Sequence, residues 1–528
     1  MTGSDSIHQD PYGGIVQWMV WLVNSIPGRD IVVRYIASSY QHDPVRSLLE
    51  LILFIFALRT ILQNRTRARG NSHFIDFSKK EIDYLVKEFE PEPLCSPLTA
   101  EQQEELDGIP EVCGHASARP LVKAPWMTGT LPRRVLNLAS FNFTGMLEAP
   151  EIEAQARTIL REYGVGSCSP PGFYGTSDMH IKLESRVATF FRKDSCIVYS
   201  QGFSTTSSVI PAFCKRGDVI VADEGVAFSI QKGLQLSRSH IHWYKHNDMK
   251  SLESVLMHLN EEQESSRRPL TRRFIVTEAL FERDGTITHL PQIVELKKKY
   301  KFRMVLDESY SAGILGNTGR GLTELQNVDP DDVDIIVGNL AIAFSTAGGF
   351  CASTKEIVKH QRINGLSFVF SAAMPVMMAN GSTVAMDLLD GDLGVFERLR
   401  ENTSILRNAL DPISAIAITS SPESPLQHVQ LRPSEDDTNL AVLYSDPKAH
   451  ASWMASQQEV LKKIERLALN QGVWISRNPH IPSIRAELDQ GPWARPSLRI
   501  IATSALSPAE MRQAADIVRA SIVSVLGS

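Results

Sequence analysis

An acidic residue followed by closely spaced glycines is the first feature that points to chemistry. Asp307 ends the apolar run Arg303–Asp307, and the turn-rich loop after it contains four glycines in the sequence SYSAGILGNTGRG. A carboxylate at the carboxyl end of a strand can pair with a pyridine nitrogen and keep it protonated, which makes the ring an electron sink. The alternative is that Asp307 caps a helix or forms an ion pair in the core, and this motif alone does not separate the two.

A second candidate is the stretch Tyr163–Thr176, YGVGSCSPPGFYGT, which is dense in glycine, serine and proline. A loop of this composition lets the backbone approach a ligand or a neighbouring subunit closely. The alternative is an ordinary surface loop. Cys168, Phe173 and Tyr174 are residues of the kind that is usually buried, and they argue against it.

The third stretch is Asp334–Ser353, DIIVGNLAIAFSTAGGFCAS. Its pattern predicts a strand that ends at Gly338, a short loop, a tight turn at Gly348 and Gly349, and a second strand. The whole stretch contains no lysine, and Ile342 lies in the loop. No residue of this loop therefore offers an amine for covalent catalysis.

Short apolar runs that alternate with amphipathic stretches must position these residues. The strand candidates are Cys196–Ser200, Asp218–Ala222, His240–Tyr244, Phe274–Glu278, Arg303–Asp307 and Ile335–Gly338. The helix candidates are Ile181–Phe191, Ser229–Leu236, Leu252–Leu259 and Ile293–Tyr300. This alternation predicts an α/β fold with a mainly parallel sheet that is covered on both faces. Ligands then bind at the carboxyl ends of the strands.

We divide this region into a large domain over 135–400, in which 135–160 belongs partly to the small lobe, and a small lobe over 401–528. The second part contains strand-like runs at Asn470–Ile475 and Leu498–Ala502 and an amphipathic helix at Met511–Leu526. The resemblance described below makes Arg499, in the second of these runs, a candidate for meeting a substrate carboxylate. A structural salt bridge is the alternative.

The N-terminal region has a different composition. Residues 1–44 contain the short apolar run Ile15–Val23, which predicts an interfacial helix, and residues 45–63 form the better candidate for a transmembrane helix. Arginines that follow the second run favour the cytosolic side for the rest of the chain. The alternative is an amphipathic helix packed on the globular domain.

Residues 64–134 are expected to form a linker arm. Within it, Lys79–Phe89 has the apolar spacing of an amphipathic helix, and Glu90–Pro97 is rich in proline and ends that helix. The segment that follows, to about Pro132, is polar, and we expect it to be irregular.

Composition excludes several classes of protein. A net charge of −6 over 528 residues gives no support for nucleic-acid binding. The six cysteines lack C-x-x-C spacing, so a zinc site or a disulfide framework is not expected, and a reducing compartment is favoured.

The motifs together resemble the α-oxoamine synthases. The matching stretches are LASFNFTGM from Leu138, YGVGSCSPPGFYGT, IQKGLQL from Ile230, KHNDM from Lys245 and LDESYSAGILGNTGRG. The resemblance implies the aspartate-aminotransferase fold, pyridoxal 5'-phosphate (PLP) as the cofactor, and condensation of an amino acid with an acyl-CoA with loss of carbon dioxide. It extends over nearly the whole chain.

Three positions depart from the family pattern. Ala227 stands where active members have the histidine that stacks on the cofactor ring, and Tyr310 replaces a second histidine after the acid-bearing strand. Ile342 stands at the position of the PLP lysine, while Asp307 survives as a vestige of the cofactor site. Without the lysine, neither a Schiff base nor a general base is available. Lys355 lies beyond the glycine turn and is not expected to replace it.

The resemblance therefore implies a non-catalytic subunit of a long-chain-base synthase, which joins L-serine to palmitoyl-CoA. A lysine-bearing paralogue would hold PLP, and this chain would complete the partner's site with Cys168, Tyr174, Ser345 and Thr346. The resemblance also implies the endoplasmic reticulum membrane, a small activating subunit and Orm-type regulators. The alternatives are a membrane scaffold that keeps only the fold and an active homodimeric PLP acyltransferase.

Overall fold

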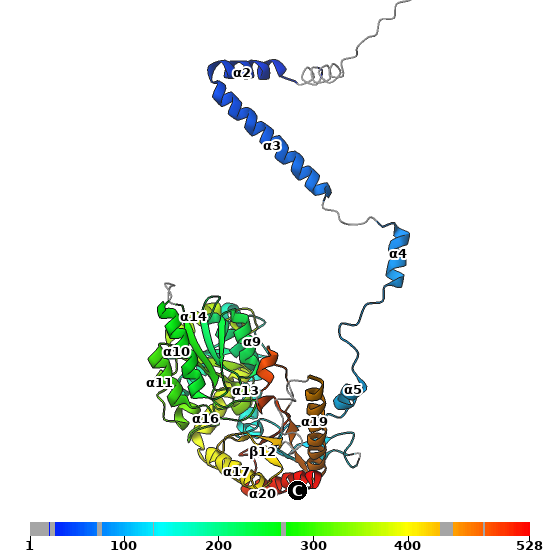
Figure 1. Cartoon of the computed structure of the whole chain (residues 1–528), viewed down its shortest axis with the longest axis vertical. Coiled ribbons are helices and arrows are strands. Elements are labelled where there is room, and N and C mark those ends of the chain that lie inside the picture. Colours follow the sequence, from blue (N-terminus) through cyan, green and yellow to red (C-terminus); the bar gives the residue numbers. More distant parts are fainter. Residues whose placement is uncertain are drawn as a thin grey trace, which may run out of the picture. The chain divides into compact units, whose positions relative to one another are not determined.

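The computed structural model describes residues 21, 27–70, 77–129, 131–265, 271–432, 447–478, 481–490 and 492–527. The chain divides into two compact units, Met1–Leu98 and Thr99–Ser528. The two units are shown in Figure 1 and are described here one at a time.

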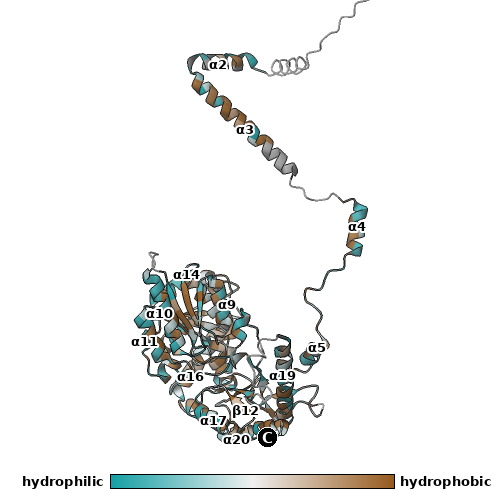
Figure 2. Ribbon diagram, in the orientation of Figure 1, coloured by the Kyte–Doolittle hydropathy of each residue, from teal (hydrophilic) through white to brown (hydrophobic). Residues whose placement is uncertain are grey.

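The first unit contains three helices in its described part, followed by a non-helical segment over 89–98. Its helices are α2 (Arg29–His42), α3 (Pro44–Gly70) and α4 (Lys79–Glu88). Helix α3 begins with a proline, which is favoured in the first turn of a helix. Its apolar side chains from Leu48 to Leu62 are exposed, and they appear brown in Figure 2.

The expected transmembrane segment 45–63 is therefore helical, and the helix continues to Gly70. Among the residues that the structure describes, no helix has both the length and the apolar character needed to cross a membrane. The predicted interfacial helix Ile15–Val23 lies outside the described residues, apart from Trp21.

Helix α4 confirms the amphipathic helix predicted over 79–89. Ser78 caps its amino end: the Glu81 backbone N–H donates to the Ser78 hydroxyl at 3.3 Å, and the Ser78 N–H donates to the Glu81 carboxylate at 2.8 Å. This reciprocal pair is a capping box, which fixes where the helix begins.

A seven-stranded sheet forms the centre of the second unit. Its order is β5 (Ser195–Tyr199), β11 (Gly349–Ser353), β10 (Ile335–Asn339), β9 (Arg303–Asp307), β8 (Arg273–Glu278), β6 (Val219–Asp223) and β7 (His240–Tyr244). Strand β11 is antiparallel to both of its neighbours, and the other pairs are parallel. The predicted strands and their mainly parallel arrangement are confirmed.

Helices cover both faces of this sheet because its strands are apolar on both sides. In β9, Met304 and Leu306 belong to one core cluster and Val305 to the other. In chain order, the helices of this part of the second unit are α6 (Pro150–Tyr163), α7 (Asp178–Phe190), α8 (Gly202–Phe213), α9 (Phe228–Ser237), α10 (Met249–Ser265), α11 (Leu290–Tyr300), α12 (Leu322–Leu325), α13 (Leu340–Phe344), α14 (Lys355–Asn364), α15 (Leu366–Val369), α16 (Val376–Gly391) and α17 (Gly394–Leu410).

A smaller sheet organises the C-terminal part. It contains β12 (Ile416–Ile418), β13 (Leu426–Leu431), β16 (Leu498–Ile501) and β15 (Ser476–Arg477) in that order, and β14 (Val473–Trp474) pairs with β4 (Leu136–Asn137). Helices α19 (Pro447–Asn470) and α20 (Pro508–Leu526) gather around it with α17 (Figure 1). The β14–β4 pair joins residues 136–137 to this C-terminal part of the chain.

The segment from Thr99 to Arg134 corrects the expectation of an irregular arm. It contains α5 (Ala100–Asp107) and a three-stranded sheet of β1 (Glu111–Val112), β2 (Leu121–Lys123) and β3 (Arg133–Arg134). Thr99 and Gln102 form a capping box that starts the helix. The Trp126 indole donates a hydrogen bond to the Gly108 carbonyl at 2.8 Å, and Val122 is fully buried. These contacts between separated residues give a polar sequence an ordered fold.

Candidate functional site

The candidate site lies at the carboxyl edge of the seven-stranded sheet, where β6, β8, β9 and β10 end. Asp307 is the last residue of β9 and is buried. Its Oδ2 accepts a hydrogen bond from the Thr206 hydroxyl at 2.8 Å, and its Oδ1 accepts from the Ser309 backbone N–H at 2.8 Å. Burial raises the pKa of Asp307, although these hydrogen bonds oppose the shift.

Ala227 is connected to Asp307 by Glu278, a residue of the neighbouring strand β8. Glu278 ends β8 directly opposite Asp307 in the strand register, and its carboxylate accepts the Ala227 backbone N–H at 2.5 Å. Glu278 is buried, and burial together with the nearby Asp307 raises its pKa well above the usual range. Ala227 has only a methyl group, so no aromatic or imidazole ring extends from this position.

Tyr310, which follows β9, and Arg499 of β16 form a second group around the Phe141 ring. The Tyr310 ring meets the edge of Phe141 at 5.2 Å, and the Arg499 guanidinium lies 4.6 Å from the centre of the same Phe141 ring. Tyr310 and Arg499 are neighbours of the Glu282 carboxylate that lower its pKa against the effect of burial. Burial raises the pKa of Glu282 and lowers that of Arg499. The Arg499 Nε is buried with no hydrogen-bond partner in the described part of the chain.

Ile342 occupies the short helix α13, between β10 and the glycine turn. Asn339 caps this helix by accepting the Ala341 backbone N–H at 2.8 Å, and Ser345 ends it in the left-handed conformation with φ 51°. The Ile342 side chain is 7% exposed and belongs to the main core cluster. The predicted loop is therefore a helix, and the position without the lysine faces the protein interior. Lys355 is exposed at the start of α14.

Ser345 and Thr346 lie next to α16. They line a cavity together with Met146, Ile152 and Met378. The Thr346 and Ser382 hydroxyls are 2.5 Å apart. The structure thus places these two predicted residues at the end of α13, beside the core that holds Ile342.

Cys168 and Tyr174 are separate from this group. Cys168 is exposed with φ 52°, and the Tyr174 side chain is 89% exposed. Their loop is held by a hydrogen bond from the Ala373 N–H to the Ser169 carbonyl at 3.0 Å. Within the described residues, no hydrogen bond or ion pair joins either residue to Asp307, Tyr310 or Arg499.

A buried charge cluster at the end of β6 and β7 has no counterpart in the sequence analysis. His246 bonds to Asp223 at 2.7 Å through Nδ1 and to Asp284 at 2.9 Å through Nε2. Burial alone would lower the pKa of His246, but the two carboxylates outweigh it and raise the pKa to about 10. The stretch KHNDM contained the histidine, but the two acids come from other segments, so only the fold shows the cluster.

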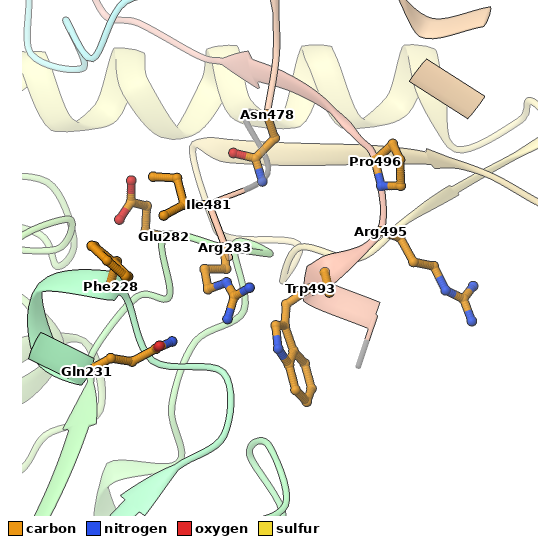
Figure 3. A pocket seen from close by; sticks show the side chains of 10 residues that line it. Phe228, Gln231, Glu282, Arg283, Asn478, Ile481, Trp493, Arg495 and Pro496 are labelled. Atoms are coloured by element: carbon orange, nitrogen blue, oxygen red, sulfur yellow. The ribbon is translucent and has the colours of Figure 1, made fainter. Parts of the chain in front are cut away.

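Glu282, Arg283 and Trp493 border a narrow cleft between the two lobes of this unit (Figure 3). Arg283, which lines the cleft, also pairs with Asp489 at 3.1 Å. The cavity has a volume of about 50 Å³, which is room for a few water molecules. The glutamate and the tryptophan were also missed by the sequence analysis, because no motif surrounds them.

These residues do not fit PLP as a resident cofactor of this chain. No lysine lies in the loops that join β6 to α9, β8 to α11 and β9 to α12, or in the segment from β10 to the glycine turn. Both Asp307 carboxylate oxygens already accept hydrogen bonds from the protein. At the start of α8, the Asn339 amide packs closely on Gly202: a Cβ added to this glycine would lie only 2.4 Å from the amide nitrogen. The described site has acids and one unpartnered arginine nitrogen but no amine placed for covalent chemistry.

Comparison with known proteins gives the affiliation of the chain. Residues 133–518 match the family model of aminotransferase class I and II. The chain is 35% identical to serine palmitoyltransferase 1 of Dictyostelium discoideum over 475 residues, which cover 89% of this chain and 92% of that protein. It is 33% identical to serine palmitoyltransferase 1 of Saccharomyces cerevisiae over 524 residues, 95% of this chain and 93% of that one.

A solved structure supports the fold. Serine palmitoyltransferase from S. paucimobilis with a bound PLP–myriocin aldimine superposes with a TM-score of 0.68 at 20% identity, over 86% of this chain and 100% of that chain. The expected PLP-dependent aminotransferase-like α/β fold is therefore confirmed.

Proposed function

The chain belongs to the aminotransferase class I and II family and, within it, groups with the serine palmitoyltransferase 1 proteins; from this premise we propose that it is the subunit of serine palmitoyltransferase without the PLP lysine. The complex condenses L-serine with palmitoyl-CoA to 3-ketodihydrosphingosine and releases carbon dioxide and CoA. This is the first step of sphingolipid biosynthesis.

The single observation that carries the subunit role is Ile342. It is buried in α13 between β10 and the glycine turn, the place that the family pattern gives to the lysine. Isoleucine has no ionisable group, so it can neither bind the cofactor covalently nor move a proton. The chain therefore needs a partner for turnover.

The partner that we propose is serine palmitoyltransferase subunit 2, a lysine-bearing paralogue. PLP bound to its lysine would supply the electron sink for the reaction. The present chain would stabilise that subunit and complete its site with Cys168, Tyr174, Ser345 and Thr346.

Exposed apolar side chains support a partner at the glycine-rich loop. Val165 is 78% exposed, Phe173 72% and Tyr174 89% in the single chain. Three neighbouring large side chains that face water are unusual for a monomer and are typical of an interaction surface. A partner seated there would lie directly against Cys168.

We also propose that the first unit attaches the complex to the endoplasmic reticulum membrane, with the second unit in the cytosol. The exposed apolar residues of α3 support attachment. A small activating subunit and Orm-type membrane proteins are proposed to bind this region. Attachment to a membrane would suit an acyl-CoA substrate and a lipid product.

The test compares the purified full-length chain alone with the pair. We would record the visible absorbance of protein-bound PLP and the serine-dependent release of CoA from palmitoyl-CoA. We expect neither signal from the chain alone and both from the pair. PLP absorbance and turnover from the chain alone would contradict the proposal. Full turnover by the partner alone would favour a scaffold.

A further inference from the structure

A second cavity lies at the edge of the seven-stranded sheet opposite to the candidate site. It is bordered by the first residues of β8 and β9, by Phe213 at the end of α8 and by His360 on α14, and its volume is about 380 Å³. We call it the amino-edge cavity. The ligands of parallel α/β sheets bind at the carboxyl edge, so the proposed reaction does not use this cavity.

The lining of the amino-edge cavity is strongly positive. It contains one acid, Glu356, and four cations: Arg272, Arg273, Lys301 and Arg303. In the part of the chain that the structure describes, none of the four cations forms an ion pair with a carboxylate. The Arg272 guanidinium donates to the Phe213 carbonyl at 2.8 Å, which does not neutralise it.

The single acid is engaged elsewhere. Glu356 is in the first turn of α14, where the backbone N–H groups and the Thr354 side chain at the helix start lower the pKa of its carboxylate. It is therefore ionised but directed to the helix end. An excess of three positive charges remains around the cavity.

Arg273 gives independent evidence that the cavity suits an anion. Its guanidinium lies 4.8 Å from the centre of the Phe302 ring, and its Nη1 is buried without a hydrogen-bond partner among the described residues. Burial lowers the pKa of Arg273, and no carboxylate opposes that shift. A buried guanidinium nitrogen without an acceptor is costly, so an acceptor is expected at this point.

We propose that the amino-edge cavity is a binding site for a phosphate ester or polyphosphate, held by Arg273 and Arg303 with help from Lys301. Arginine donates in a planar fork that matches two phosphate oxygens, and the second arginine, at the start of the neighbouring strand β9, can hold a further oxygen. A lipid headgroup and a soluble phosphate present the same chemistry to these side chains.

The test uses the purified complex of the full-length chain with its lysine-bearing partner, in detergent. Pyrophosphate is titrated by calorimetry against the wild type and against R273Q/R303Q, in buffers matched in ionic strength with chloride. We expect saturable binding that the double substitution weakens at least tenfold. The control is Arg519→Gln, which removes an exposed arginine of α20 and should leave binding unchanged.

Mixed micelles with and without phosphatidic acid form the second arm. If the complex binds micelles with phosphatidic acid in a way that depends on Arg273 and Arg303, and does not bind pyrophosphate, the site exists and its ligand is a lipid headgroup. If R273Q/R303Q does not fold, K301Q/R303Q replaces it, since both side chains are exposed.

No binding in either arm, or binding that both variants leave unchanged, would overturn the proposal. Turnover of the pair is measured alongside and should be the same in all variants. A failure of the phosphate site is therefore distinguishable from a failure of the subunit role.

Discussion

At the scale of the residue, His246 is the buried group whose charge the fold depends on most clearly. Both ring nitrogens face carboxylates, and its side chain is 11% exposed. The same contacts lower the pKa of Asp284 against the effect of burial. The three groups therefore form one buried cation held between two anions, and the removal of the cation leaves the anions without a counter-charge.

We expect His246→Gln to lower the free energy of unfolding by about 3–5 kcal/mol, the usual cost of breaking a buried ion pair. The folded pKa of about 10 exceeds the ordinary value near 6.5. The stabilisation that protonated His246 provides is therefore complete below about pH 6.5 and is lost as the pH rises toward about 10. Urea unfolding of both proteins between these pH values checks this. A difference between them that does not change with pH would contradict it.

Cys168 tests the loop that we place at the partner's site. We expect Cys168→Trp to lower serine-dependent CoA release by the pair about tenfold or to weaken selectivity for L-serine, because a bulky ring displaces the groups it meets. The Cys168 backbone has φ 52°, so the experiment needs a control for backbone strain caused by any substitution at this position. Cys168→Asn tolerates that conformation and should retain activity. Cys95→Trp, at another exposed cysteine, should also be neutral. Unchanged activity and selectivity in Cys168→Trp would exclude the placement.

At the scale of the element, the start of α20 combines a helix cap with a long-range tie. Ser507 and Glu510 form a capping box, and Glu510 also pairs with Arg119 at 2.6 Å. The Arg119 bond and the Ser507 cap lower the pKa of Glu510 to about 2. One carboxylate thus fixes the end of a helix and attaches the segment before β2 to it.

We expect Glu510→Ala to cost about 1–2 kcal/mol of stability, in the range of a lost helix cap. Glu510→Gln keeps a side chain that can complete the capping box and should cost less stability. Comparing the two variants therefore separates the contribution of the cap from that of the charge. Since the folded pKa is lowered, the contribution of the charge is present above pH of about 4.5 and is lost as the pH falls toward 2. Thermal unfolding at pH 7 and pH 4 checks both. Equal losses in the two variants would show that the charge is what matters.

Regular elements were predictable where a signal is local. Cys196–Ser200 was expected to be a strand and β5 covers Ser195–Tyr199, because a strand that is buried on both faces is a continuous apolar run. Helix α13 was missed because its existence depends on one cap, Asn339, and it contains only five residues. Strands β1 to β3 were missed because their burial depends on contacts far along the chain.

The candidate site was predictable only in part, for a similar reason. Asp307, Ala227, Tyr310 and Ile342 lie in motifs that a family pattern aligns, and the structure places the first two on either side of Glu278. The glutamates that complete the site, Glu278 and Glu282, stand in a segment with no motif. Their significance comes from burial next to other charges, which the order of residues does not reveal.

At the scale of the whole molecule, the single chain leaves an apolar surface that needs a partner. Val165, Phe173 and Tyr174 on one loop are exposed, and so are Leu366 and Phe370 at α15. Helix α15 contacts the short helix Pro171–Gly175 of that loop, so these side chains belong to neighbouring elements. A surface of this composition is costly in water and gains free energy when a second subunit covers it.

We expect the double substitution of Phe173 and Phe370 by serine to weaken assembly with the lysine-bearing partner about tenfold or more, since aromatic residues dominate the binding energy of interfaces. Quantitative co-purification of the full-length pair over a dilution series measures the change. Met257→Ser removes an exposed apolar side chain from α10 and serves as the control. The thermal stability of the isolated chain should remain the same, because neither ring is buried within it. Unchanged assembly would mean that the partner binds another face and that Cys168 lies far from its site.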